Sequence, residues 1–209
     1  MVLVDMTFFT NCALFSVDFQ AGERGAPATA ESLPPDWVAM GFTADDVNAA
    51  TTFAWDTALP NAVRVVESCR AAGLPGLFVH WGHRFEDGMD LDPPIRAMML
   101  REHGSDFTKW PGHIGEPGSR PPDCFNVQPG EYVIAKTAQD TFVSSNAGFV
   151  LANLGVKNLI LIGGHTEACL GKTARGAKRK GFKTLCVTDA TTNARESTRL
   201  HGIRDAEFD

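Results

Sequence analysis

The sequence predicts an α/β fold in three αβα layers, in which a doubly wound parallel sheet lies between two layers of helices. Short apolar segments alternate with helical segments along the chain, which is the pattern of a parallel sheet covered on both faces. The apolar segments lack polar alternation, as expected of strands buried on both sides. With 209 residues, 44% of them hydrophobic, the chain is long enough for one core, so we expect residues 1–209 to form a single domain.

Five apolar segments are the strand candidates. In chain order they are residues 12–17, 77–80, 132–135, 159–162 and 184–187. The stretch before the first of them is also apolar, but it contains Asp5 and no Lys or Arg, so a secretory signal peptide is not predicted. We interpret that stretch as leading into a buried first strand.

The helices between these strands are recognised by their ends. Residues 61–72 follow Pro60 and stop at Gly73, which are the positions that proline and glycine favour at helix termini. Residues 146–154 and 167–180 are likewise followed by glycine, and a last helix is expected around residues 195–204.

Two stretches interrupt the alternation of strands and helices. Residues 21–59, rich in Ala, Pro and Thr, and residues 104–130, rich in Gly and Pro, are too long for ordinary connections. Each is expected to be a long loop, serving either as a surface or subunit contact or as a cover over a ligand site. The sequence leaves both interpretations open.

Composition and charge exclude several classes of partner. The chain has 25 acidic against 19 basic residues, a formal net charge of -6, which disfavours nucleic acid. No apolar run approaches the ~18 residues that a membrane span requires. The five cysteines are odd in number and form no CxxC or zinc pattern, so we expect a reducing, cytoplasmic location.

Cys169 has the position most suited to chemistry. It follows the segment NLILIGGHTEA, in which an apolar strand runs through Gly163 and Gly164 into the start of a helix. Unpaired backbone N–H groups and the helix dipole are expected to stabilise a thiolate there, and the same amides can bind an oxyanion. The other thiols lack this position: Cys12, Cys69 and Cys186 are expected to be buried core residues, and Cys124 stays undecided.

The glycine pair permits another interpretation, a phosphate-binding turn. The segment GGHTEA lacks the GxGxxG spacing, and no GxxxxGK[ST] motif occurs in the chain. A dinucleotide site is therefore not predicted, and no cofactor is expected.

Two charged residues end other strands. Asp18 follows the first strand in LFSVDFQ, and Lys136 ends the third in YVIAKT. The carboxyl ends of parallel strands open into one crevice, so Asp18, Lys136 and Cys169 are expected to converge. A thiol nucleophile needs a base and a group that stabilises charge, which these two residues can supply.

These motifs, in this order, resemble the isochorismatase-like cysteine hydrolase superfamily. The resemblance runs from ALFSVDFQ through YVIAKTAQDTFVSSN to LILIGGHTEACLGKTARGAKRKGF. It implies a catalytic triad of Asp18, Lys136 and Cys169 and a cis peptide between Gly164 and His165. It also implies an oxyanion hole formed by the backbone N–H groups of His165 and Cys169.

The resemblance further implies a cysteine-dependent amidohydrolase that cleaves a C–N bond of a small amide or ureide, nearest the ureide, biuret and N-carbamoyl branch. A nicotinamidase-like amidase and a non-catalytic binding protein remain alternatives, whereas Cys169 disfavours isochorismate cleavage. Family members imply a homo-oligomer, either a dimer or a tetramer. The candidates for substrate binding are Gln20, Arg84, Trp110, Phe142 and His165.

A metal site is not predicted. Metal-binding relatives carry an Asp-x-His motif after the second strand, where this chain reads HWGHRFEDGMDL. His80 and His83 are three residues apart and Asp87 and Asp90 follow, but ligand number and spacing are poor for a bound ion.

Overall fold

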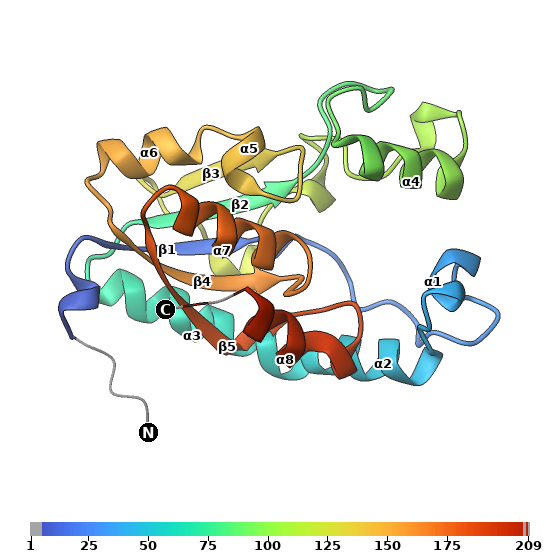
Figure 1. The fold of residues 1–209 in the computed structure, drawn as a ribbon, viewed down its shortest axis with the longest axis horizontal. Helices are drawn as coiled ribbons and strands as arrows, with labels where there is room; N and C mark the ends of the chain where they lie inside the picture. The colour runs from blue at the N-terminus through green and yellow to red at the C-terminus, as the bar shows by residue number, and fades with distance from the viewer. Residues whose placement is uncertain (1–5, 207, 209) are drawn as a thin grey trace.

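The computed structural model describes residues 6–206 and 208, and its centre is a sheet of parallel strands in the order β3-β2-β1-β4-β5 (Figure 1). The strands coincide with the five predicted segments or extend them by a few residues. They are β1 (Cys12–Val17), β2 (Gly76–Trp81), β3 (Tyr132–Lys136), β4 (Asn158–Gly164) and β5 (Lys183–Thr192). The predicted α/β fold is confirmed.

The strand order makes the sheet doubly wound. The chain passes outward from β1 through β2 to β3 and then returns to the other side of β1 to form β4 and β5. The order therefore reverses between β1 and β4, and the crevice at such a switch point is where open parallel sheets bind ligands. Val17 pairs with Gly163 across this boundary, so Asp18 and the turn after β4 emerge side by side.

Helices cover both faces of the sheet. On one face α5 (Thr141–Ser144), α6 (Ala147–Asn153) and α7 (Cys169–Arg179) pack over a buried apolar core. On the other face α3 (Leu59–Ala71) buries Ala62, Val66 and Cys69 against a second core. The last helix, α8 (Glu196–Asp205), contacts β5 and α7.

Residues 21–59 are not the long loop that their composition predicts. They contain α1 (Pro35–Ala39), α2 (Ala44–Phe53) and a π-helical turn, η2 (Ala54–Ala58), that continues directly into α3. Thr43 caps α2 by accepting a hydrogen bond from the Asp46 N–H at 3.2 Å. The Ala- and Thr-rich segment has little apolar periodicity, which is why only the cap indicates this helix in the sequence.

The π turn explains why α3 begins before Pro60 instead of at it. The Leu59 N–H donates to the carbonyl of Ala54, five residues earlier. Proline has no N–H and its ring crowds the carbonyl four residues before it, so the wider turn accommodates Pro60 within a continuous helix. Trp55 lies in this turn.

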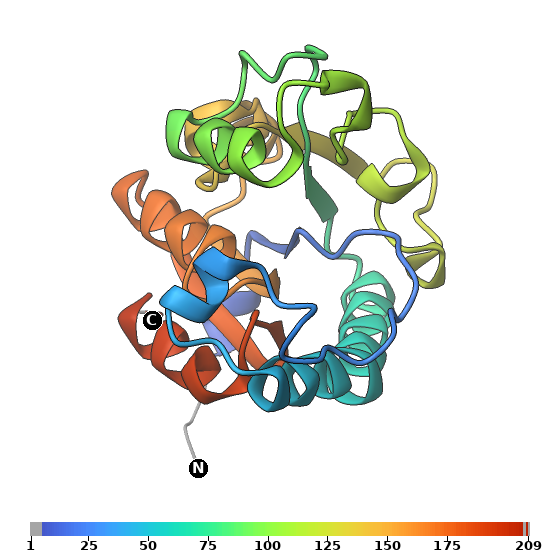
Figure 2. The same ribbon diagram turned by 90° about the vertical axis from the view of Figure 1, so that its right-hand side faces the viewer.

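The second long stretch keeps its irregular character. The helix α4 (Pro93–His103) precedes it, and 104–130 contains only the short 3-10 turns η3 (Phe107–Lys109), η4 (Pro117–Ser119) and η5 (Asp123–Phe125). A small 3-10 turn, η1 (Met6–Phe9), precedes β1. The α1 and α4 regions lie at the end of the molecule toward which the strands point, as Figures 1 and 2 show. Across residues 6–206 and 208, no helix is long and apolar enough to cross a membrane.

Candidate active site

A buried ion pair joins the ends of β1 and β3. Asp18 follows β1 with a φ of 54°, and its N–H donates to the carbonyl of Val79 at 2.8 Å. Lys136 is the last residue of β3 and has no exposed side-chain surface; its Nζ lies 2.8 Å from Oδ2 of Asp18 and 3.0 Å from the Ala138 carbonyl oxygen. The structure thus brings together two residues that are 118 positions apart in the sequence.

Each charge of this pair stabilises the other. Burial alone would lower the pKa of the Lys136 ammonium, but the neighbouring Asp18 and the Cys169 sulfur reverse the effect and raise it. Lys136 therefore stays protonated at neutral pH. The other carboxylate oxygen of Asp18, Oδ1, is buried without a hydrogen-bond partner among the residues described, so one acceptor site of the carboxylate is left open.

Cys169 lies beside this pair as the first residue of α7, and its thiol is half-buried. Burial and then the charge of Asp18 raise the pKa of the thiol to about 12, against the opposing effect of Lys136. The expectation that the helix N-terminus holds a thiolate is therefore wrong for the resting state. The thiol is protonated at neutral pH, and a base must take its proton before the sulfur can attack.

Two backbone N–H groups are available near the thiol. The Gly164–His165 peptide bond is cis. Hydrogen bonds in this turn engage other groups: the Thr166 N–H donates to Thr192, and the His165 carbonyl accepts from Ala168 and Leu170. Within the described part of the chain, the N–H groups of His165 and Cys169 have no acceptor.

The glycines of this turn are required by packing. Gly163 has a φ of 111°, and a Cβ there would overlap the carbonyl oxygen of Val17 on β1. A Cβ on Gly164 would overlap Oγ1 of Thr192 on β5. The glycine pair thus lets β4 approach its two neighbours closely at the switch point.

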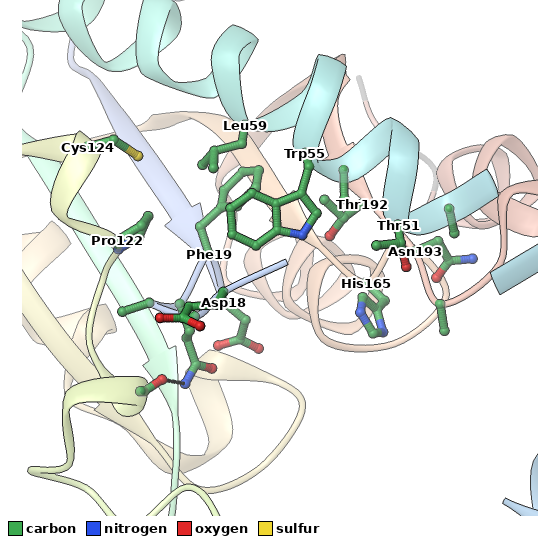
Figure 3. A pocket seen from close by; sticks show the side chains of 18 of the residues that line it. Asp18, Phe19, Thr51, Trp55, Leu59, Pro122, Cys124, His165, Thr192 and Asn193 are labelled. Carbon is green, nitrogen blue, oxygen red and sulfur yellow. Dashed lines mark hydrogen bonds between the residues drawn. The ribbon is translucent and has the colours of Figure 1, made fainter. Parts of the chain in front are cut away.

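A cavity of about 760 Å³ opens beside Asp18 and His165 (Figure 3). Its walls come from the segment after β1, from α2, η2 and the start of α3, from 117–124 and from 192–194. Lys136 and Cys169 are not among its lining residues. Most of the side chains that line it are apolar, among them Phe19, Trp37, Val47, Trp55, Leu59 and Pro122.

The candidate substrate-binding residues divide into two groups. Gln20 and His165 line the cavity. Both ends of the Gln20 amide are engaged, because Nε2 donates to the carbonyls of Trp81 and Gly118 and Oε1 accepts from the Trp81 N–H. The side chain of His165 lines the cavity, and desolvation by the surrounding protein lowers the pKa of its imidazole.

The other three candidates do not line this cavity, and their role in substrate binding stays a prediction. Phe142 is half-buried against the core and stacks on the rings of Phe15 and Phe182, with centroids 5.9 and 5.7 Å away. Trp110 is 3% exposed and its Nε1 donates to the Gly104 carbonyl. Arg84 is exposed, and its Nη1 lies 3.8 Å from Oδ2 of Asp90. Spacing in the sequence could not separate these side chains from those that face the cavity.

Of the two histidines considered for a metal, His83 follows β2 and makes a structural contact, whereas His80 lies within β2 and its Nδ1 has no hydrogen-bond partner among the described residues. The ring Nδ1 of His83 lies 2.8 Å from the Phe85 carbonyl, and the Asp90 carboxylate accepts from the N–H groups of Arg84 and Phe85. Among residues 6–206 and 208, no three His, Cys, Asp or Glu side chains are grouped to hold a metal ion.

Of the remaining thiols, Cys12 and Cys69 are buried in the core as expected, whereas Cys186, also expected there, is only half-buried. Burial raises the pKa values of Cys12, Cys69 and Cys186 to about 12, 11 and 12. Cys124 is exposed and lines the cavity near Pro122. For the cavity wall formed by α2, the Thr43 cap is the signal that the residues carry.

The switch-point crevice, the buried Lys136–Asp18 pair and the adjacent thiol define a class, a hydrolase built on a doubly wound α/β sheet. Residues 12–207 match the model of the isochorismatase domain. The chain belongs to the isochorismatase family, and the resemblance noted in the sequence is confirmed.

Individual relatives agree with this assignment. The chain is 30% identical over 150 residues to a probable inactive nicotinamidase of Arabidopsis thaliana, covering 70% of this chain and 73% of the relative. It is 31% identical over 151 residues to the streptothricin hydrolase of Streptomyces noursei, covering 69% of this chain but only 51% of that protein. An isochorismatase family protein from Desulfovibrio vulgaris superimposes with a TM-score of 0.69 at 22% identity, covering 93% of this chain and 88% of that one.

Proposed function

We propose that the protein is a cysteine-dependent amidohydrolase that cleaves the C–N bond of an amide or ureide through an acyl-enzyme on Cys169. The observation that carries the proposal is the 2.8 Å contact between Lys136 Nζ and Asp18 Oδ2 beside a thiol whose pKa Asp18 raises. Asp18 is placed to accept a proton, Lys136 to hold charge, and Cys169 to act as nucleophile.

Acylation begins when the Asp18 carboxylate takes the proton of the Cys169 thiol. The sulfur then forms a bond to the substrate carbonyl carbon, and the carbonyl electrons move to oxygen. The N–H groups of His165 and Cys169, for which no acceptor is found among the described residues, donate hydrogen bonds to that oxyanion. As the C–N bond breaks, protonated Asp18 gives its proton to the departing nitrogen, leaving a thioester.

Deacylation repeats these steps with water. Asp18 takes a proton from a water molecule as the water oxygen bonds to the thioester carbon. The C–S bond then breaks, and the sulfur recovers the proton from Asp18. Lys136 stays protonated throughout, which keeps the carboxylate anionic between proton transfers. Water and amide are consumed, and acid and amine are released.

A nicotinamidase-like activity is the second candidate, because relatives named nicotinamidase align over about 70% of the chain. One of these is named inactive, which keeps the non-catalytic alternative within the test. The amide or ureide hydrolase, the nicotinamidase-like amidase and the non-catalytic protein would share the same fold. They would differ in turnover and in substrate.

The test compares the wild type with Cys169→Ser on a panel of amides and ureides that includes nicotinamide, with ammonia or amine release as the readout. Cys186→Ala is the matched control, because this thiol is also half-buried but lies on β5 outside the cavity. Loss of turnover in Cys169→Ser alone supports the mechanism. Equal turnover in all three proteins contradicts it, and absence of turnover in the wild type favours a binding protein.

A further inference from the structure

We propose that the cavity selects amides that carry a bulky apolar or aromatic group and are neutral or positively charged. Amides that carry a carboxylate are rejected. This inference rests on the proposed function and names the substrate class that the site accepts. It follows from three properties of the cavity: its apolar walls, the sign of the charges that line it, and its volume.

The walls favour a flat apolar group. Trp55, carried by the π turn, lies over the cavity near Phe19, with Leu59 on the same side (Figure 3). Trp37 and Val47 add further apolar surface. Aromatic side chains of this kind bind rings by stacking and by burial of apolar area, and they also attract cations to their faces.

The charges that line the cavity are negative. Its carboxylate lining residues are Asp18, Glu23 and Asp123, and its other ionisable lining residues are Cys124 and His165. Asp18 is neutralised by Lys136, whereas Glu23 and Asp123 are exposed at the mouth. Of the residues described, no Lys or Arg lines the cavity. A substrate carboxylate entering it would lose hydration without gaining a counterion.

Two arginines adjoin cavity-lining residues in the sequence, Arg24 after Glu23 and Arg195 after Ala194, and both contact other groups. Arg24 pairs with Asp56 at 2.8 Å and donates to Thr52 at 3.2 Å. Arg195 lies over the ring of Phe42, 4.4 Å from its centroid, and donates to the carbonyl of Met40. These contacts hold both guanidinium groups to other parts of the chain, and neither arginine lines the cavity.

The volume sets the size of the substrate. About 760 Å³ is within the range of sites that hold drug-sized ligands and far exceeds what a carbamoyl or acetamide group fills. The net charge of -6 also favours the approach of cations over anions. The cavity therefore fits a large arylalkyl or amino-bearing amide better than a short anionic ureide.

The test measures binding and turnover of three matched amides: phenylacetamide, its para-aminomethyl derivative and its para-carboxylate derivative. Binding to Cys169→Ser is followed by calorimetry, so the result does not depend on catalysis. The neutral and cationic amides are expected to bind at least about tenfold more tightly than the carboxylate, because an unpaired charge is costly to desolvate. The same order is expected for kcat/KM in the wild type.

Two variants test the charges at the mouth. Glu23→Gln and Asp123→Asn should each reduce the preference for the cationic over the neutral amide about two- to fivefold, the effect of one exposed charge. Glu86→Gln, an exposed carboxylate outside the cavity, is the control and should leave the preference unchanged.

Three results overturn the inference: the carboxylate binds as tightly as the other two amides, none of the three binds to Cys169→Ser, or the mouth variants leave the preference unaltered. Failure of the proposed function gives a different pattern. In that case the amides bind in the expected order, but the wild type releases no amine or releases it independently of Cys169.

Discussion

The Nζ of Lys136 lies 2.8 Å from Oδ2 of Asp18, and the lysine side chain has no exposed surface. Two charges removed from water stay stable only while each has the other. Removing Lys136 leaves the Asp18 carboxylate, which is 11% exposed, without its counterion. The pair therefore stabilises the carboxyl end of the sheet and is also a candidate for catalysis.

Lys136→Met, a change of similar volume, should lower the free energy of unfolding by about 3–5 kcal/mol and abolish most turnover. Urea denaturation at neutral pH measures the stability. Lys157→Met, at an exposed position, is the control and should change it little. The double variant Asp18→Asn/Lys136→Met should recover part of the lost stability, because no unpaired charge remains. Unchanged stability in the single variant would contradict the importance of the pair.

Asp18→Asn should lower the pKa of the Cys169 thiol and yet reduce hydrolysis. The negative charge of Asp18 is the second cause, after burial, that raises this pKa to about 12, so its removal leaves less opposition to the thiolate. The ultraviolet absorbance of the thiolate, as the difference from Cys169→Ala in the same background, follows the titration. Hydrolysis should fall about 10²- to 10⁴-fold because the base is missing. An unaltered titration, or retained hydrolysis, would assign Asp18 another role.

Gly163→Ala and Gly164→Ala should both destabilise the protein, but only the second should be rescued. The added Cβ at Gly163 meets the backbone of Val17, which cannot be removed, whereas that at Gly164 meets a side-chain oxygen of Thr192. We expect each single variant to lose about 2–4 kcal/mol. Thermal denaturation of Gly164→Ala/Thr192→Ala should recover part of the loss. Equal losses with and without Thr192 would show that the close approach lies elsewhere.

Attachment of a bulky maleimide to Cys124 should reduce kcat/KM by about tenfold or more, because the adduct occupies the cavity and displaces the substrate. Cys124 is exposed and lines the cavity, and burial with the nearby Asp123 raises the pKa of its thiol. Labelling should therefore be faster at pH 8.5 than at pH 7. Cys124→Ser, treated with the same maleimide, should keep the kcat/KM of the untreated variant. Loss of activity in that variant would show that the maleimide reacts with Cys169.

The sheet was predictable from the sequence because its strands are buried on both faces and therefore read as uninterrupted apolar runs. The convergence of Asp18, Lys136 and the turn before Cys169 followed from the direction of parallel strands alone. The protonation of Cys169 was not predictable in this way, because burial and the Asp18 carboxylate raise the pKa of its thiol and outweigh the helix N-terminus.

The cavity was not predictable to the same degree. Its wall is formed largely by α2 and η2, whose Ala- and Thr-rich sequence resembles a loop. Tertiary packing decides which aromatic residues line the cavity: Trp55 does, whereas the candidates Trp110 and Phe142 pack against other side chains. No periodicity in the chain distinguishes these outcomes.

The π turn at Ala54–Ala58 has a consequence for how the site can diverge. Such a turn adds one residue to an otherwise regular helix, so deleting a single residue there would restore α-helical geometry and rotate α2 about 100° relative to α3. Trp55 and the α2 residues of the wall would then face elsewhere, while Asp18, Lys136 and Cys169 would stay in place. Substrate range in this lineage can therefore shift through the gain or loss of one codon, independently of the reacting groups.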